Sequence, residues 1–148
     1  MKFFILLLIS IFILSCSDIT TFNSRPYVIH KDYGGDVLLY ERKLIKLKEN
    51  QREVKIVGTC VSACTLYLQI ACVTPNSKIG FHGVSMYGHY VTDENRRITK
   101  LIADTYPPKL KEWFLKNAVH LYGKDVKYLS GSDVIQMGAR KCQDNSLD

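Results

Sequence analysis

The chain has 148 residues, of which 47% are hydrophobic, and this size and composition are typical of one globular domain with a single core. Chains of about 150 residues bury roughly 68–70% of their unfolded surface, so the fold need not depend on disulfides. The net charge is +6, but the basic residues are scattered without an aromatic-interleaved basic stripe, which argues against a nucleic-acid partner.

The N-terminal residues predict an export signal of the lipoprotein type. Lys2 precedes an apolar run from Phe3 to Leu14, which is well short of the roughly 20 residues that cross a bilayer as a helix. The run ends in ILSC, which resembles a bacterial lipobox, so we expect residues 1–15 to be a signal peptide and Cys16 to be lipidated. The alternative is ordinary signal cleavage nearby, with Cys16 unmodified.

Residues 16–25 are polar and rich in Ser and Thr, which predicts a lipid-proximal tether ahead of one domain at 26–148. Removal of Lys2 with the signal leaves 19 basic and 14 acidic residues, a balance that suits an anionic membrane surface. The sequence therefore predicts an exported lipoprotein that is anchored to a membrane and faces the periplasm.

Short strands alternate with helices along the domain. Strands are predicted at 27–30 and 52–59 and at the end of 72–82, helices at 37–50, 62–71, 93–106 and 109–121, and a last helix capped by Ser130 and stopped by Gly138. This alternation predicts an α/β fold in which βαβ units build a parallel sheet with flanking helices.

Ser62 lies where a predicted strand gives way to a helix, in the stretch VGTCVSACTLYL. A serine at such a junction exposes its hydroxyl at the carboxyl end of the sheet, and the helix N-terminus behind it favours developing negative charge. The residue is either an acyl-transfer nucleophile or only a small residue in a tight turn. For a nucleophile, the amides of Ala63 and Gly35 are the candidate oxyanion donors, because an oxyanion hole needs backbone N–H groups that side chains leave uncovered.

His82 is the candidate general base, because it ends the next predicted strand, twenty residues after Ser62. The other histidines fit less well: His30 precedes the glycine turn, His89 lies in a Tyr- and Gly-rich loop, and His120 lies on a helix. A lone His82 would be read as a structural histidine, whereas its combination with the serine and the glycine pair favours catalysis.

Three segments resemble, in order, the proteolytic subunit of the Clp protease and the wider Clp/crotonase superfamily. YGGD at 33–36 is similar to that family's glycine pair ahead of a helix, and GTCVSACTLYL at 58–68 to its Gly-x-x-x-Ser segment. PNSKIGFH at 75–82 is similar to its Pro-Asn-Ser segment ending in His. The cysteines around the serine resemble those of exported Clp-like proteins. The resemblance implies a Clp/crotonase-like sheet of ββα and βαβ units and a serine peptidase activity.

A fourth segment, KDVKYLSGSDVIQMGA at 124–139, is similar to the family's Asp followed by a Ser-capped helix. The resemblance points to Asp125 as the carboxylate that orients His82. The sequence departs from the family's pattern here, because the Asp lies one residue farther from the Leu-Ser pair. Asp125 is therefore either the third member of a triad or only a solvated loop charge. Asp133 is read as a helix cap and nothing more.

Four cysteines remain if Cys16 carries lipid, and an even number in an oxidising compartment suggests two disulfides. If Cys64 and Cys72 shared one helix they would lie about 12 Å apart, which is too far for a bridge. The preferred pairs are Cys60 with Cys64 and Cys72 with Cys142. A zinc site or a nucleophilic Cys is the alternative, but the Cys-x-x-x-Cys spacing is unlike the usual zinc knuckle.

These features predict an exported, ATP-independent, Clp-like serine peptidase or acyl hydrolase that acts on peptides or proteins without a metal or other cofactor. Its partners would be the substrate and the membrane, reached through the N-terminal lipid. The resemblance also implies a homo-oligomer, for which the helices at 93–121 are the candidate contacts. The main alternative is a binding or assembly lipoprotein that keeps the fold without turnover. An acyl-CoA enzyme fits poorly, because coenzyme A is cytosolic and the Ser/His pair would be superfluous.

Overall fold

The structure is a computed structural model that describes residues 25–86 and 90–143. The predicted signal peptide at 1–15, the lipidation site Cys16 and almost all of the predicted tether lie outside the described residues, as does His89. None of the described helices is both long and apolar enough to cross a membrane.

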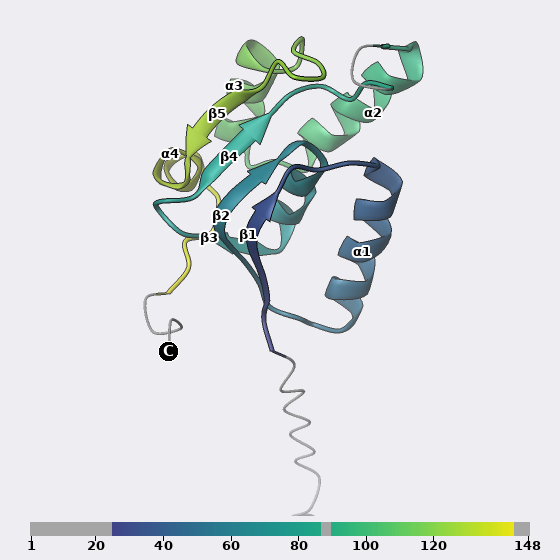
Figure 1. The fold of residues 1–148 in the computed structure, drawn as a ribbon. Coiled ribbons are helices and arrows are strands. Elements are labelled where there is room, and N and C mark those ends of the chain that lie inside the picture. Colours follow the sequence, from purple (N-terminus) through teal and green to yellow (C-terminus); the bar gives the residue numbers. More distant parts are fainter. Residues whose placement is uncertain (1–24, 87–89, 144–148) are drawn as a thin grey trace, which may run out of the picture.

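The described chain contains the three predicted strands and the predicted helices in their expected order, and it adds two short strands (Figure 1). The strands are β1 Tyr27–Asp32, β2 Val54–Val61, β3 Ala71–Val73, β4 Lys78–Phe81 and β5 Lys127–Ser130. Of these, β3 and β5 are the two that the sequence did not predict. The helices are α1 Val37–Glu49, the 3₁₀ helix η1 Ser62–Gln69, α2 Asp93–Asp104, α3 Pro108–Asn117 and α4 Gly131–Gln136.

The strands form one five-stranded sheet in the order β1-β2-β4-β5, with β3 also paired to β2. β1, β3 and β4 run parallel to β2, whereas β5 runs antiparallel to β4. The α/β class with flanking helices is therefore confirmed, but the prediction of an entirely parallel sheet is wrong.

The physical reason for the antiparallel strand is where the chain arrives after α3. The Gly83 amide donates to the carbonyl of Leu121 at 2.8 Å, so the chain that leads into β5 already lies beside the carboxyl end of β4. From there it can add an edge strand only by running back along β4. The strand β5 is only four residues long, all but Leu129 are exposed, and its sequence has no clear alternation of apolar and polar residues.

The predicted helix at 62–71 is a 3₁₀ helix that ends at Gln69, and Cys72 belongs to β3 rather than to this helix. The helix ends early because Ala71 pairs with Val54 of β2 and the following residues continue that pairing. The amide of Ile70 donates to the Tyr67 carbonyl at 2.9 Å, which closes the last turn. Extended pairing with the central strand thus replaces the final helical turn.

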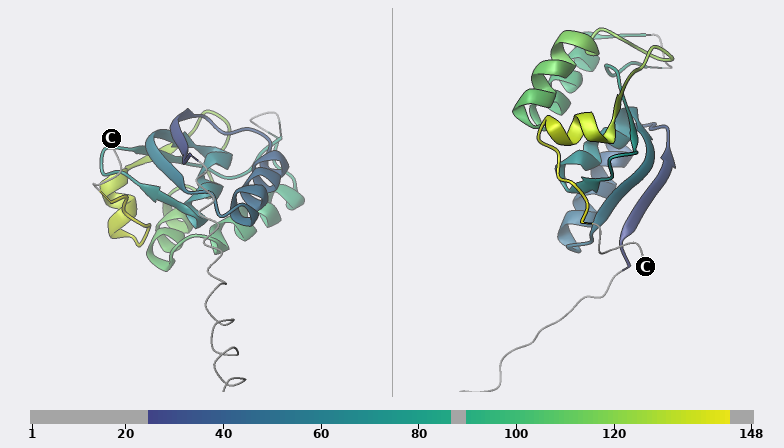
Figure 2. Two further views of the ribbon diagram at one scale, coloured as in Figure 1. Left: turned by 90° about the horizontal axis from the view of Figure 1, so that it is seen from below. Right: turned by 90° about the vertical axis from the view of Figure 1, so that its left-hand side faces the viewer.

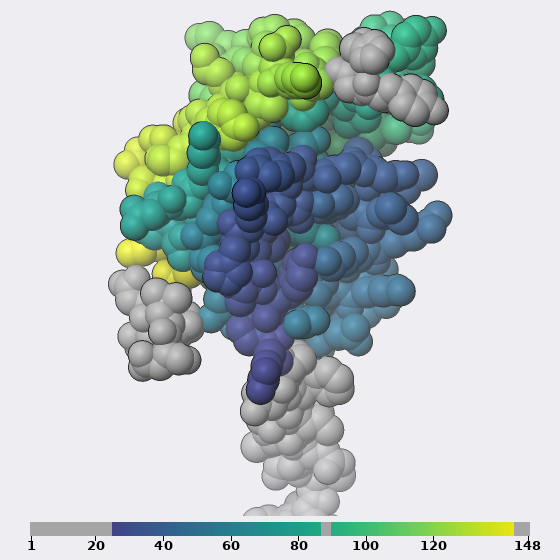
Figure 3. Space-filling view, in the orientation of Figure 1, coloured from purple at the N-terminus to yellow at the C-terminus, as the bar shows by residue number. Residues whose placement is uncertain are grey.

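The helices gather on one side of the sheet (Figure 2, right). On that side Phe81 of β4 packs edge-on against the rings of Tyr106 and Trp113, with centroids 5.7 and 5.5 Å apart. Figure 3 shows β1 at the front surface of the molecule with α1 beside it. β1 is an edge strand, so its end and the turn that follows are open to solvent.

Capping fixes the ends of the later helices. Ser130 and Asp133 form a capping box at the start of α4, with the Asp133 amide 3.1 Å from the Ser130 hydroxyl, as the sequence predicted. Gly138 follows this helix with φ +108°, which a residue with a side chain rarely adopts. Asp133 is therefore a helix cap and lies outside the site described below.

Candidate active site

The parallel strands bring the predicted site residues to one edge of the sheet. The arrowheads of β1, β2 and β4 point the same way in Figure 1. Val61 of β2 pairs with Gly80 of β4, so β2 and β4 are adjacent and end close together. Ser62 comes directly after β2, and His82 comes directly after β4. Asp32 pairs with Cys60, which places the glycine turn after β1 beside the same edge. Ligands bind at this position in open α/β sheets.

An open cleft of about 1130 Å³ lies at this edge, and every predicted catalytic and oxyanion residue lines it. These residues come from four separate segments of the chain: Gly35, Ser62, Ala63, His82 and Asp125. Much of the remaining wall is apolar and comes from the first turn of α1 and from α2: Val37, Leu38, Ile98 and Ile102. The cleft thus has an apolar wall that faces the side chains and backbone of the predicted site residues.

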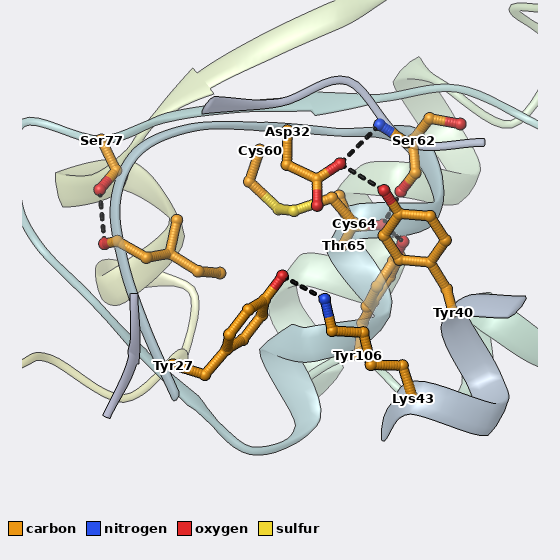
Figure 4. The surroundings of a disulfide bond; sticks show 12 residues. Tyr27, Asp32, Tyr40, Lys43, Cys60, Ser62, Cys64, Thr65, Ser77 and Tyr106 are labelled. Carbon is orange, nitrogen blue, oxygen red and sulfur yellow. Dashed lines mark hydrogen bonds between the residues drawn. A yellow bond between two sulfur atoms is a disulfide. The ribbon is translucent and has the colours of Figure 1, made fainter. Parts of the chain in front are cut away.

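Ser62 occupies a strained backbone position. Its φ is +59°, in the left-handed region that residues with side chains rarely adopt. Its carbonyl accepts a hydrogen bond from the Thr65 hydroxyl at 2.7 Å, and the Cys60–Cys64 disulfide spans it (Figure 4). Strain of this kind persists only where the surroundings fix it, and here it turns the serine out of the strand at the edge of the sheet.

Gly34 packs closely against residues 61–63, which are called the serine turn below. It has φ +81°, and a Cβ at this position would lie 2.7 Å from both the Ser62 Cβ and the Val61 carbonyl oxygen. Only glycine fits this close approach. The glycine pair and the serine are therefore packed as one unit, which brings the Gly35 backbone to the cleft beside Ala63.

Ala63 is the second residue of η1, and the first amides of a helix have no partner within it. The Gly35 amide makes no hydrogen bond to the described part of the chain. Both residues line the cleft, so their backbone N–H groups are the candidate donors to a substrate oxygen.

His82 is half-buried, and its Nδ1 atom is buried without a hydrogen-bond partner. Burial lowers the pKa of the imidazole below its ordinary value, an effect that the nearby backbone of Gly83 opposes. A neutral imidazole is what a general base requires. Within the described residues no hydrogen bond joins His82 to Ser62 or to Asp125.

Asp125 reaches this edge because β5 is antiparallel, so that the start of β5 lies at the carboxyl end of β4. It is exposed, and its amide donates to the Tyr122 carbonyl at 3.1 Å. The other carboxylate that lines the cleft, Asp36, caps α1 by accepting from the amide of Leu38 at 2.8 Å. Among the described residues, Asp125 is therefore the carboxylate of the cleft whose side chain is unengaged.

Thr65 and Tyr106 also line the cleft, and no pattern in the sequence predicted them. Their hydroxyl oxygens lie 2.7 Å apart, although the two residues are 41 positions apart in the chain. Burial raises the pKa of the Tyr106 hydroxyl, so it stays protonated. The pair links α2 and its following turn to the serine turn, a contact that only the folded chain reveals (Figure 4).

The structure contains disulfides between Cys60 and Cys64 and between Cys72 and Cys142, the pairs that the sequence favoured. All four sulfurs are bonded, which leaves no thiolate at these positions for nucleophilic or metal chemistry. In the described ranges 25–86 and 90–143, no group of three or more His, Cys, Asp or Glu side chains is arranged to hold a metal ion.

The sequence matches no model of a known protein family and no curated protein. The functional conclusion therefore depends on the fold and the cleft. The cleft combines a turned-out hydroxyl, a histidine whose neutral form is favoured, two backbone amides and one unengaged carboxylate. Groups of these kinds are the ones that a search for an unassigned active site looks for.

Proposed function

We propose that the protein is a Clp-like serine peptidase or related acyl hydrolase with a Clp/crotonase-like fold. The observation that carries the proposal is the convergence of Ser62, His82 and the amides of Gly35 and Ala63 on one cleft. These groups come from the ends of three parallel strands, and a scaffold without turnover has no need to keep them together.

In the proposed reaction, His82 takes the proton from the Ser62 hydroxyl as its oxygen attacks the substrate carbonyl carbon. The amides of Gly35 and Ala63 donate to the oxyanion of the tetrahedral intermediate. His82 then gives the proton to the leaving amine as the bond to the acyl carbon breaks. Water, deprotonated by His82, hydrolyses the acyl-enzyme and restores the serine.

We further propose that the protein works outside the cytoplasm. Two disulfides are typical of an oxidising compartment, and they accord with the export signal and lipid anchor predicted for residues 1–16. An exported enzyme has no ATP available, so we propose ATP-independent turnover of peptides near the membrane. Assembly into a homo-oligomer through the region of α2 and α3 remains a prediction.

The proposal is tested by treating the purified protein with a fluorophosphonate probe and mapping the modified residue by mass spectrometry. We expect a single adduct at Ser62. Cleavage of a peptide library would then give the substrate preference.

A binding or assembly lipoprotein is the second candidate. It is favoured by the unpartnered Nδ1 atom of His82 and by the lack of a Ser62–His82 hydrogen bond among the described residues. A folded protein that neither reacts with the probe nor cleaves any peptide would support this candidate and overturn the enzymatic proposal.

Asp125→Asn should lower the rate of Ser62 acylation by about 10⁴, the effect of losing the orienting carboxylate in the general triad case. The physical reason is that Asp125 is the unengaged carboxylate of the cleft and His82 Nδ1 is the buried atom that needs a partner. The rate of probe labelling measures the effect.

The matched control for Asp125 is Asp133→Asn, since Asp133 caps α4 and does not line the cleft. This variant should label at the wild-type rate. If Asp125→Asn also labels at that rate, the site works as a Ser-His dyad and the triad prediction is wrong.

The pH dependence of labelling should report the lowered pKa of His82. A general base works only when neutral, so the rate falls as the pH drops through the pKa of this histidine. Because burial lowers that pKa, we expect full reactivity to persist into mildly acidic solution, below the midpoint of an ordinary histidine. A labelling profile with its midpoint above the ordinary histidine value would contradict burial as the main influence on the base, and would indicate that a carboxylate partner raises the pKa of His82 during the reaction.

A further inference from the structure

We infer that Asp32 is a positioning residue that sets the glycine turn so that the Gly35 amide serves the oxyanion. This inference deepens the proposed function and rests on it. Asp32 is the last residue of β1 and lies two positions before Gly34. It is not among the residues that line the cleft, so we attribute its effect on catalysis to the turn that it holds.

The Asp32 carboxylate is engaged on one oxygen by two donors (Figure 4). Its Oδ1 atom accepts from the Gly34 amide at 2.9 Å and from the Tyr40 hydroxyl of α1. Burial and the bond to Asp32 raise the pKa of the Tyr40 hydroxyl, so it remains a donor at any pH at which the protein works. The carboxylate thus ties β1, the glycine turn and α1 together at one point.

The bond to Gly34 decides which of the two glycine amides faces the substrate. The Gly34 N–H is directed at the Asp32 carboxylate and is not available to the cleft. The Gly35 N–H makes no hydrogen bond to the described chain, and Gly35 lines the cleft. Because Gly34 is packed against the Ser62 Cβ and the backbone of Val61 and Ala63, a rotation of this turn would move the Gly35 amide relative to the serine.

Tyr40 holds Asp32 in place from the other side. Its ring lies 5.5 Å from the ring of Tyr67, a fully buried residue of η1. η1 is also the helix that Ser62 opens. Asp32 therefore couples the position of one oxyanion donor to the same helix that carries the nucleophile and the other donor.

Asp32 could instead serve stability alone by tying β1 to α1, and two substitutions separate the two roles. Asp32→Ala removes the acceptor, whereas Asp32→Asn removes the charge but keeps an oxygen that can accept from the Gly34 amide. A positioning role needs the acceptor, so Asn should rescue what Ala loses. Tyr40→Phe, which removes one donor and keeps the ring, should have a smaller effect than Asp32→Ala.

The test measures two quantities on the full-length mature protein in detergent: the rate of labelling by a fluorophosphonate, and amide hydrogen exchange at Gly34 and Gly35 by NMR. In the wild-type protein we expect slow exchange at Gly34 and fast exchange at Gly35. Asp32→Ala should speed exchange at Gly34 and slow labelling by about 10²–10³, the usual cost of losing one oxyanion donor. Asp32→Asn should restore both, and the labelling midpoint in pH should not move.

Labelling of Asp32→Ala at the wild-type rate would overturn the inference while leaving the proposed hydrolase intact. Equal losses in the Ala and Asn variants would also overturn it, since the acceptor would then not be the part that matters. A wild-type protein that is never labelled would instead refute the proposed function. In that event the exchange rates at Gly34 alone show whether Asp32 sets the turn.

Discussion

Ser62→Ala and His82→Ala should each abolish acylation by a fluorophosphonate and any peptide cleavage, with a loss on the order of 10⁶ in rate. Members of such a pair act as a unit, so removing either costs about as much as removing both. In the proposed mechanism Ser62 supplies the attacking oxygen. It lies in a strained turn, and His82, whose pKa is lowered by burial, lines the same cleft. Labelling rates and thermal unfolding of each variant measure the effect and show that the fold survives.

Two matched controls accompany these variants. Ser85→Ala removes another half-buried hydroxyl that lines the cleft, and His120→Ala removes an exposed histidine outside it. Both should label at the wild-type rate. A loss of only tenfold in Ser62→Ala, or no loss of labelling in His82→Ala, would show that a different group carries the chemistry.

The parts of the site that could be predicted from the sequence share one property: each is marked by local chemistry. The glycine pair, the serine at a strand-to-helix junction and the histidine at the end of the next strand are all visible within a few residues. The parallel pairing of β1, β2 and β4 then brings these ends together without further information. Ser130 and Asp133 are likewise a local signature, and the structure confirms their capping box.

The parts that could not be predicted depend on long-range pairing. Asp125 was named through the family resemblance, but how it reaches the cleft was not predicted, because that depends on the antiparallel strand β5, whose four residues have no strand signal of their own. The Thr65–Tyr106 contact joins residues far apart in the chain. The positioning role inferred for Asp32 could not be predicted for a different reason. It follows from the direction of the Gly34 amide, which the residue types do not reveal.

The two disulfides should differ sharply in what their removal costs. The Cys72–Cys142 bridge joins residues 70 positions apart, and by the chain-entropy relation a loop of this size stabilises the folded state by about 4 kcal/mol. The same relation gives about 2 kcal/mol for the Cys60–Cys64 bridge, which spans four positions. Replacing both members of one bridge by Ala avoids leaving a free thiol in either variant.

The long bridge also holds backbone pairing that would loosen without it. The Cys142 amide donates to the Val73 carbonyl at 3.0 Å, and the Val73 amide donates to the Arg140 carbonyl at 2.8 Å, so the C-terminal segment is tied to β3. Denaturant unfolding of the Cys72→Ala/Cys142→Ala variant should therefore show a loss of about 4 kcal/mol, with labelling of Ser62 unchanged under native conditions.

The Cys60→Ala/Cys64→Ala variant should behave in the opposite way. Its free energy of unfolding falls by about half as much, but the left-handed backbone of Ser62 loses one of the contacts that fix it, so labelling slows. Equal stability losses in the two variants would contradict the loop-length reasoning. Unchanged labelling in the second variant would show that the Thr65 hydroxyl and the close approach of Gly34 suffice to hold the serine turn.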